Sequence, residues 1–204
     1  MKFILGTKEK MTQIFDKEGR VSPVTVLRAG PVVITQIKDK EKDGYTATQV
    51  GFGERNKKRI NKPLKGHLKN LGNFRYLREF RLRNNGAEFK PGDKIDVSIF
   101  TEGDKVNVSS ISKGKGFQGV VKRHGFHGGP RSHGQKHSER EPGSIGATGP
   151  QRVFKGTRMG GRMGGDRITV NNLRIIQIDK KNNQLFIKGA IAGRKGTLVE
   201  VKSP

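Results

Sequence analysis

The chain has 204 residues, of which 31% are hydrophobic and 29 are glycine, so its apolar residues suffice for one modest core. It carries 42 Lys or Arg against 18 Asp or Glu, a formal charge of +24 at pH 7. A compact body with this excess repels itself unless a polyanion neutralises it, which favours nucleic acid as the partner. The absence of cysteine excludes disulfides and thiolate chemistry.

Membrane association is disfavoured by the same sequence. The opening MKFILG is too short an apolar run for a signal peptide, and no run approaches the ~20 apolar residues of a membrane span. We find neither an amphipathic helix nor a lipidation motif. The sequence therefore predicts a soluble, cytoplasmic protein.

Residues 1–53 show the pattern of antiparallel β-strands. Strands are expected over 11–15 and 21–27, on either side of a turn at Gly19, and again over 32–37 and 45–52. Several short strands at such close intervals favour a small barrel or sandwich.

A basic insertion follows, with 11 Lys or Arg against two Glu over residues 54–83. Leu64, Leu68 and Leu71 lie at the spacing of one helical stripe after a proline, and 74–83 is predicted to be a strand with basic residues between aromatic ones. A solvated charged surface is the alternative interpretation. Basic and aromatic residues interleaved on so basic a chain favour a surface that contacts a nucleic-acid backbone.

Strand patterning then returns in the second half of the chain. Strands are expected at 93–100, 105–111, 168–170, 173–178, 184–187 and 197–201. We therefore predict a mainly β protein whose barrel core comes from three pieces, interrupted by a basic helical or hairpin insertion and by a long glycine-rich loop. The pieces are 1–53, 93–112 and 167–204; the insertion is 54–92 and the loop is 113–166.

The long loop dominates the functional interpretation. Residues 112–166 hold 15 of the 29 glycines and four of the five histidines, and residues 113–168 carry 12 basic against three acidic side chains. Hydrophobic residues are sparse and have no sustained period. Glycine permits close backbone approach to a phosphate or base, and Arg and Lys neutralise phosphates, so the composition favours an RNA-threaded extension over a plain flexible loop.

Two chemical alternatives for this segment are weak. Gly114, Gly116 and Gly119 match G-x-G-x-x-G, but only Val120 and Val121 follow before charged residues, and no helix or suitably placed acid is expected. The four histidines are separated by glycines that fix no metal-ligand geometry, so they are interpreted as structural or solvated groups or as RNA contacts. We therefore expect no cofactor, no metal and no catalysis.

The sequence resembles the large-subunit ribosomal protein three family, bacterial type. The residues that carry the resemblance are FTEGDKVNVSSISKGKGFQGVVKR at 100–123, followed by HGFHGGPRSHGQKHSEREPGSIG and RVFKGTRMGGRMGGDRITV. The resemblance implies a barrel like those of translation factors, binding to 23S rRNA near its 3′ end, early subunit assembly and a loop that reaches toward the peptidyl transferase region. It further implies large-subunit proteins fourteen and nineteen as neighbours.

Some bacterial members of this family carry a methylated glutamine in the loop. The interval 147–152 is one residue shorter here than in those members, so Gln151 is not assigned as that site. The hypotheses kept beside a structural rRNA-binding protein are a free RNA chaperone or translation-factor-like module, and an enzyme. The residues predicted to bind rRNA are Lys57, Lys58, Arg59, Lys113, Lys115, Lys122, Arg123, His124, His127, Arg131, His133, Lys136, His137, Arg140, Arg152, Lys155, Arg158 and Arg162.

Overall fold

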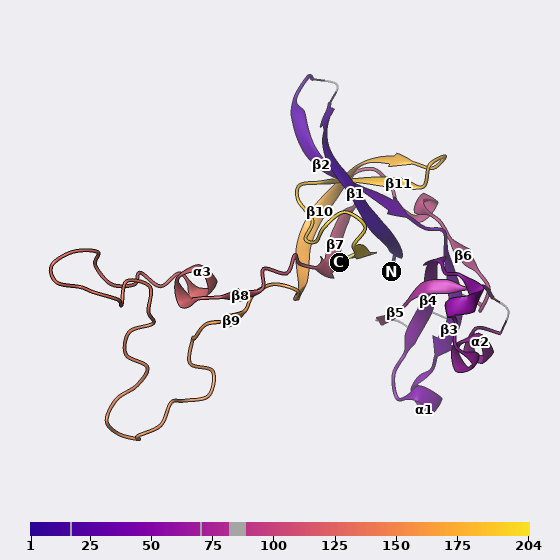
Figure 1. Cartoon of the computed structure of the whole chain (residues 1–204). Coiled ribbons are helices and arrows are strands. Elements are labelled where there is room, and N and C mark those ends of the chain that lie inside the picture. The colour runs from indigo at the N-terminus through magenta and orange to yellow at the C-terminus, as the bar shows by residue number, and fades with distance from the viewer. Residues whose placement is uncertain (17, 70, 82–88) are drawn as a thin grey trace. The chain divides into compact units, whose positions relative to one another are not determined.

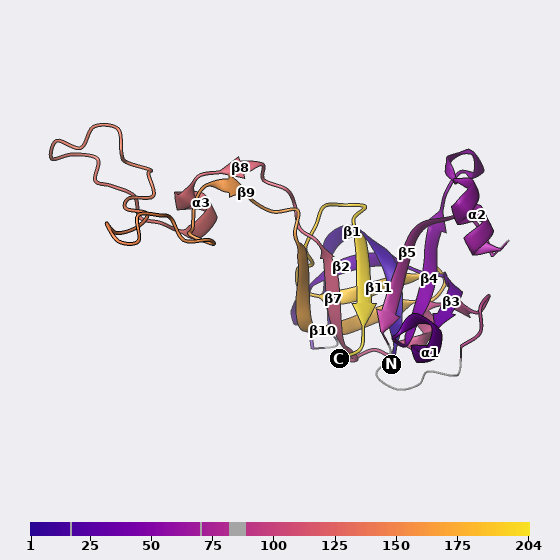
Figure 2. The ribbon, with the colours of Figure 1, turned by 90° about the horizontal axis from the view of Figure 1, so that it is seen from below.

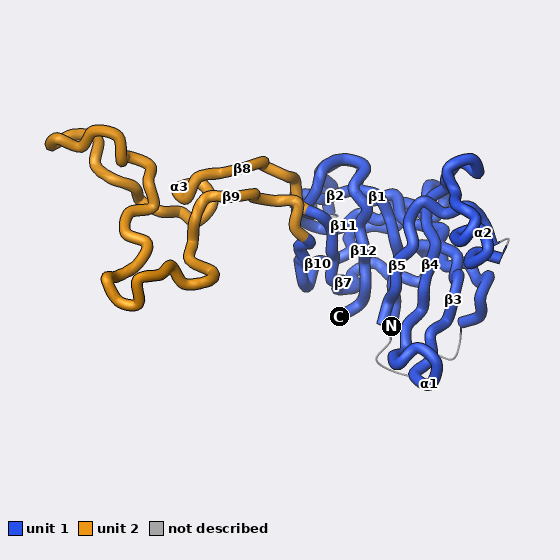
Figure 3. The backbone as a smooth tube through the Cα atoms, turned by 60° about the horizontal axis from the view of Figure 1, so that its bottom comes forward, with its two compact units in different colours: residues 1–111, 167–204 blue, residues 112–166 orange. Residues whose placement is uncertain are grey.

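The computed structural model describes residues 1–16, 18–69, 71–81 and 89–204 (Figure 1). The chain divides into two compact units, which Figure 3 shows in different colours. The first unit contains residues Met1–Ile111 and Arg167–Pro204, and the second contains Ser112–Asp166. We call the first the barrel unit and the second the extension, and we describe each by itself.

Six antiparallel strands of the barrel unit close into a barrel in the order β1–β12–β7–β10–β11–β2. Closure leaves no unpaired edge among these strands, so their backbone groups are satisfied within the sheet. Their bounds are Phe3–Phe15 (β1), Val21–Ala29 (β2), Lys105–Ile111 (β7), Arg167–Asp179 (β10), Gln184–Lys188 (β11) and Leu198–Lys202 (β12).

Strand β1 joins the two ends of the chain in this barrel. Ile4 pairs with Val201 of β12, and Gly6 pairs with Ala29 of β2. A Cβ atom on Gly6 would lie 2.7 Å from the carbonyl oxygen of Arg28. Glycine is therefore required at this position, because the two backbones approach too closely for a side chain.

A second sheet follows the barrel hairpin, with strand order β5–β4–β3–β6. Its connections contain short helices, among them α1 and α2 (Figure 2). Within the described residues, none of the helices could span a membrane. The bounds are Val32–Lys38 (β3), Lys40–Asp43 (α1), Ala47–Glu54 (β4), Lys57–Arg59 (η1, a 3₁₀ turn), Lys62–Leu68 (α2), Phe74–Arg81 (β5), Lys94–Ile95 (β6) and Val97–Ile99 (η2, also 3₁₀).

The barrel and the second sheet share one hydrophobic core. Phe3 of β1 stacks on Phe80 of β5 with ring centroids 4.6 Å apart, and both rings are buried. At the surface, Glu200 of β12 accepts a hydrogen bond from Arg78 of β5 at 3.0 Å and also binds Arg167 of β10. Apolar packing and this ion-pair cluster thus link the two sheets into one body.

The predicted class, mainly β with a closed antiparallel barrel, is confirmed. One detail differs from the sequence prediction, which places residues 32–53 in the barrel core: β3 and β4 belong to the second sheet. The predicted strand 74–83 is observed as β5, and its residues 82 and 83 lie outside the described residues.

The predicted strand over 93–100 is wrong. Of these residues only Lys94 and Ile95 (β6) form a strand, and the chain then turns through η2, where the Phe100 N–H donates to the Val97 carbonyl at 3.1 Å. Residues three apart share a face of a 3₁₀ helix, so Val97 and Phe100 are both buried while Ser98 is exposed. The hydrophobic residues that alternate in this segment are therefore buried by a 3₁₀ turn and not by a strand.

Thr48 of β4 is a destabilising polar group in the core. Its side chain is fully buried, and its Oγ1 has no hydrogen-bond partner among the described residues. We expect Thr48→Val to raise the free energy of unfolding by about 1 kcal/mol, because an unsatisfied hydroxyl is replaced by a methyl group of similar shape. Urea denaturation measures the change.

A matched control is available in Thr25, which is equally buried but donates to the Gly189 carbonyl at 2.7 Å. Thr25→Val should lower the free energy of unfolding by about 1 kcal/mol, because the carbonyl loses its partner. Equal effects of the two substitutions would contradict this interpretation of Thr48.

A second stability prediction concerns the ion pair between Lys2 and Asp104, whose Nζ and Oδ2 atoms are 2.7 Å apart. The hydrogen bond from Lys2, followed by that from the Thr101 N–H, lowers the pKa of Asp104 to about 2. Because the pKa of Asp104 is lower in the folded than in the unfolded protein, its ionised carboxyl stabilises the folded state at every pH above about 4. This stabilisation is lost as the pH falls from about 4 through about 2. Asp104→Asn should cost about 1 kcal/mol at pH 7.

Urea unfolding of wild type and Asp104→Asn at pH 7 and at pH 2 tests this expectation. The difference between the two proteins should be much smaller at pH 2, because about half of the Asp104 carboxyl is then protonated in the folded wild type. A difference as large at pH 2 as at pH 7 would assign the effect to packing instead of ionisation. Asp39→Asn is a suitable control, since Asp39 is exposed and caps α1 without a side-chain hydrogen bond.

Candidate nucleic-acid interface

The two ends of the extension are held together by backbone pairing. The Ser112 N–H donates to the Asp166 carbonyl at 2.9 Å, and the Lys115 N–H donates to the Met163 carbonyl at the same distance. A two-stranded ladder follows, formed by β8 (Phe117–Gln118) and β9 (Gly161–Arg162). The segment therefore begins and ends as a narrow hairpin.

A short helix, α3 (Val120–His124), follows β8 and carries three of the predicted RNA contacts, Lys122, Arg123 and His124. The Arg123 Nη1 donates to the Met159 carbonyl at 2.7 Å, and the ring Nε2 of His124 lies 3.0 Å from the same oxygen. A Cβ on Gly161 would lie 2.7 Å from the Arg123 Nη1. Arg123 and His124 thus connect α3 to Met159, which lies just before β9. The other N–H groups of the Arg123 guanidinium stay available to a ligand.

The remaining predicted residues are distributed along the exposed backbone of the extension. Arg131 binds Glu139, with 2.7 Å between Nε and Oε1, and Lys57, Lys58 and Arg59 form the exposed turn η1 in the barrel unit. The structure does not gather these side chains into one cluster. The exposed members in the extension are Lys113, Lys115, Lys122, His127, Arg131, His133, Lys136, His137, Arg140, Arg152, Lys155, Arg158 and Arg162.

The positive charge of the extension is almost uncompensated within it. Every residue of 112–166 is described, and the Arg131–Glu139 pair is the one ion pair among them. Unpaired surface cations are strongly hydrated, and they gain free energy when they neutralise phosphates and release counterions. The extension therefore presents a strongly positive surface, the electrostatic character that a polyanionic partner requires.

The positive charge of residues 54–83 is also preserved, because one of their two acids, Glu79, is already paired with Lys38 of β3. Lys38 Nζ lies 2.9 Å from the Tyr45 hydroxyl and 3.1 Å from the Glu79 carboxylate. The hydrogen bond from Tyr45, together with that from Lys38, lowers the pKa of Glu79, and Tyr45 and Glu79 raise the pKa of Lys38. Glu79 is therefore ionised and already paired.

Neither a metal centre nor a dinucleotide site is assembled from the described residues. No three His, Asp or Glu side chains among them are grouped as a metal would require. A helix does follow the glycines of G-x-G-x-x-G, contrary to the sequence prediction, but α3 has only five residues and β8 only two. This strand and helix are too short to form a βα unit for a dinucleotide.

Two glycines of the extension allow backbone contacts that no other residue permits. Gly128 has φ +76°, and a Cβ atom there would collide with the carbonyl oxygen of Glu139. Gly164 has φ +74°, and its Cβ would collide with the carbonyl oxygen of Lys113. At both positions the backbone is left-handed and another backbone segment lies too close for a Cβ atom. Each of these glycines is therefore required by local geometry, which the glycine content of the sequence does not reveal.

Sequence reasoning missed the exposed aromatic side chains of the extension. Phe117 is 79% exposed and Phe154 is 60% exposed, and the Arg152 guanidinium lies 5.9 Å from the Phe154 ring centroid. Exposed aromatic rings beside cations are the stacking platforms that unpaired bases use. Their exposure could have been predicted, because both phenylalanines lie in a basic, glycine-rich segment whose few hydrophobic residues show no period that would bury them.

A closed β-barrel that carries a basic, glycine-rich extension with unpaired cations and exposed aromatic rings has the features of an RNA-binding β protein. Residues 87–185 match the family model for ribosomal protein L3. The chain is 52% identical to large ribosomal subunit protein uL3 of Carboxydothermus hydrogenoformans, over 98% of this chain and 96% of that protein. The chain belongs to the ribosomal protein L3 family, whose members are structural components of the ribosome and not enzymes.

Two further relatives have the same name and similar coverage. The uL3 of Acidothermus cellulolyticus is 50% identical over 100% of this chain and 92% of its own length. That of Herpetosiphon aurantiacus is 50% identical over 97% of this chain and 94% of its own length. The bacterial resemblance found in the sequence is thus confirmed over nearly the whole chain.

A substitution at Gly128 tests whether the extension has a defined internal structure in the free protein. Gly128→Ala adds both a strained φ and a collision with Glu139, next to the hydrogen bond from the Gly129 N–H to the Glu139 carbonyl. We expect several-fold faster tryptic cleavage within the extension and an unchanged melting temperature of the barrel unit.

The matched control is Gly143→Ala, where φ is +77° but a Cβ would meet no atom within 4 Å. It carries the same backbone strain without the collision, so its cleavage should change less. Equal cleavage rates for the two variants would show that the contact at Glu139 is not formed in solution.

Proposed function

We propose that the protein is a structural constituent of the large ribosomal subunit and a primary rRNA-binding protein, which binds 23S rRNA near its 3′ end and supports early subunit assembly. In this proposal the extension reaches toward the peptidyl transferase region, and large-subunit proteins fourteen and nineteen are neighbours. Family membership and the names of the relatives support the ribosomal role. The site of binding on the rRNA and the neighbours rest on the family resemblance.

The observation that carries the proposal is the uncompensated charge of the extension. A segment of this length with one internal ion pair and no core of its own is stabilised little by its own contacts. Phosphates supply the missing partners for its lysines and arginines, and its glycine backbone and exposed rings fit unpaired RNA. The predicted rRNA-binding residues, from Lys57 in the insertion to Arg162 in β9, are proposed as these contacts.

A three-residue charge variant tests this role. Lys113→Gln, Lys115→Gln and Arg158→Gln together remove three exposed cations of the extension that have no ionic partner. For binding to a 23S rRNA 3′ fragment, the slope of log K against log salt should fall in magnitude by about 2, because each lost phosphate contact contributes about 0.7 to 0.9.

The control removes the same charge from turns of the barrel unit, through Lys180→Gln, Lys181→Gln and Lys195→Gln, all at exposed positions. Its salt slope should stay close to that of wild type. A control slope that falls as far as that of the extension variant would mean that net charge, and not the extension, governs binding. Loss of the protein from large subunits in a high-salt wash would favour a free RNA chaperone instead.

A further inference from the structure

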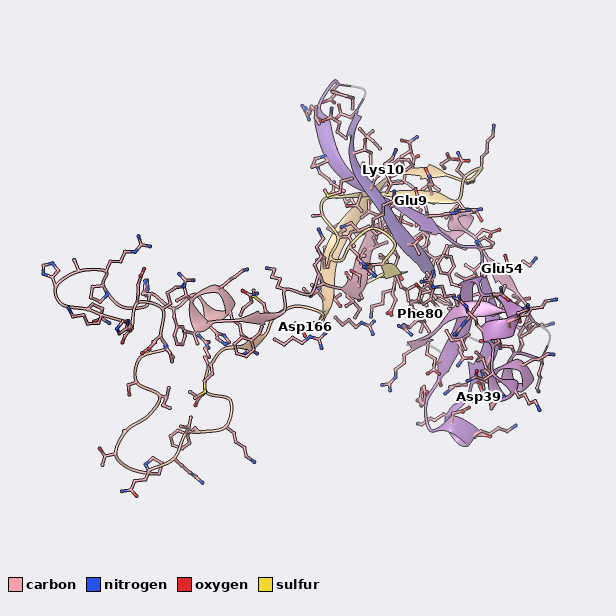
Figure 4. The ribbon with its side chains drawn as sticks, in the orientation of Figure 1. Glu9, Lys10, Asp39, Glu54, Phe80 and Asp166 are labelled. Carbon is pink, nitrogen blue, oxygen red and sulfur yellow. The ribbon has the colours of Figure 1, made fainter. Side chains whose placement is uncertain are left out.

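A pocket in the basic insertion has features that a simple phosphate-contacting surface does not need. It lies between η1, α2 and residues 72 and 73, which precede β5. Figure 4 labels Glu54, the last residue of β4, from which the chain leads into η1. Its volume is about 400 Å³, within the roughly 300–1,000 Å³ range of small-ligand pockets. It is lined by Lys57, Ile60, Lys65, Leu68, Gly72 and Asn73.

The walls of this pocket are fixed by backbone hydrogen bonds. The Arg55 N–H donates to the Asn73 carbonyl at 2.8 Å, and the Leu71 N–H donates to the Leu68 carbonyl at 2.8 Å. The Asn56 side chain accepts a hydrogen bond from the Lys58 N–H at 3.0 Å and so caps η1. The pocket is therefore formed before any ligand binds.

The lining combines three kinds of chemistry. The half-buried Ile60 supplies the apolar part of the pocket, and the almost fully buried Leu68 (2% exposed) packs behind it. Lys57 and Lys65 are exposed, and neither has an acidic partner among the described residues. The half-buried Asn73 has a side-chain amide with no hydrogen-bond partner within the described ranges.

We propose that this pocket binds one unpaired nucleotide of RNA. Its phosphate would pair with Lys57 and Lys65, its base would lie against Ile60 and Leu68, and the Asn73 amide would bind the edge of the base. Apolar side chains and amides are the groups that receive unstacked bases, and an amide offers both a donor and an acceptor to a base edge. The inference rests on the proposed function, because it names one element of the RNA that the protein binds.

Other ligands fit the lining less well. The phosphates of a paired helix require cations on an open surface and leave an apolar floor unused. An acidic peptide side chain would satisfy the lysines but has no flat apolar face for Ile60 and Leu68. A nucleotide uses all three parts of the pocket, and the surrounding sequence, with seven basic residues against one acid over 54–69, attracts its chain.

The test is methyl and amide NMR of the full chain, titrated with AMP, CMP, GMP and UMP at constant ionic strength. Inorganic phosphate and ribose 5-phosphate are the reference titrants. We expect the nucleotides to shift the Ile60 and Leu68 methyl signals and the Asn73 side-chain amide, while the reference titrants leave the methyl signals in place. Equal methyl shifts with phosphate alone, or none with any nucleotide, would overturn the inference.

Two variants with the same charge locate the site. Lys57→Gln with Lys65→Gln should raise the Kd for the preferred nucleotide about fivefold or more, as expected for lost charge-assisted contacts. Lys62→Gln with Lys69→Gln removes the same charge from exposed positions that do not line the pocket, and should change the Kd less than about twofold. Equal effects of the two variants would place the nucleotide outside the pocket.

A third variant examines the base edge. Asn73→Leu keeps the size of the side chain and removes its amide, so it should reduce the difference in Kd between the best and worst nucleotides. The two proposals fail separately. Absence of nucleotide shifts with salt-dependent rRNA binding intact would overturn only the pocket, whereas failure of wild type to bind rRNA would overturn the proposed function.

Discussion

The antiparallel pairing of β7 with β10 is the constraint on which the extension depends. Ile111 pairs with Arg167 at the point where the chain leaves and re-enters the barrel unit, and Val108 pairs with Val170 deeper in the barrel. Closing a loop of 55 residues costs conformational entropy, and the packed barrel strands supply the free energy that holds its ends together. The extension can therefore be built from glycine and cations and needs no hydrophobic core.

Most of the fold could be predicted because alternating hydrophobic residues mark individual strands. The alternation identifies β2, β7 and β12, where it marks the buried valines Val24, Val26, Val106, Val108, Val199 and Val201. It does not identify pairing partners, since these are set by contacts far apart in the sequence. For this reason β3 and β4 were assigned to the wrong sheet, and the residues of η2, which alternate as a strand would, were predicted to be extended.

The sequence predicts where the positive charge of the candidate site lies, but it does not predict which contacts the individual side chains make. Residue types alone show where cations concentrate, but Arg123 is committed to the Met159 carbonyl and Arg131 to Glu139, through contacts 36 and eight residues away in sequence. The pocket in the insertion was hidden for the same reason. Ile60 and Asn73 belong to different elements, and neither carries a motif that relates it to the other.

The common core of the two sheets has a consequence for how the protein organises RNA. Phe3 and Phe80 are packed together in that core, so the basic insertion cannot shift against the barrel without exposing buried aromatic surface. On the proposed function, RNA bound by Lys57, Lys58 and Arg59 would therefore be held at a fixed distance from the barrel. The shared core would then contribute a defined spacing to the bound RNA, in addition to the charges that the lysines and arginines neutralise.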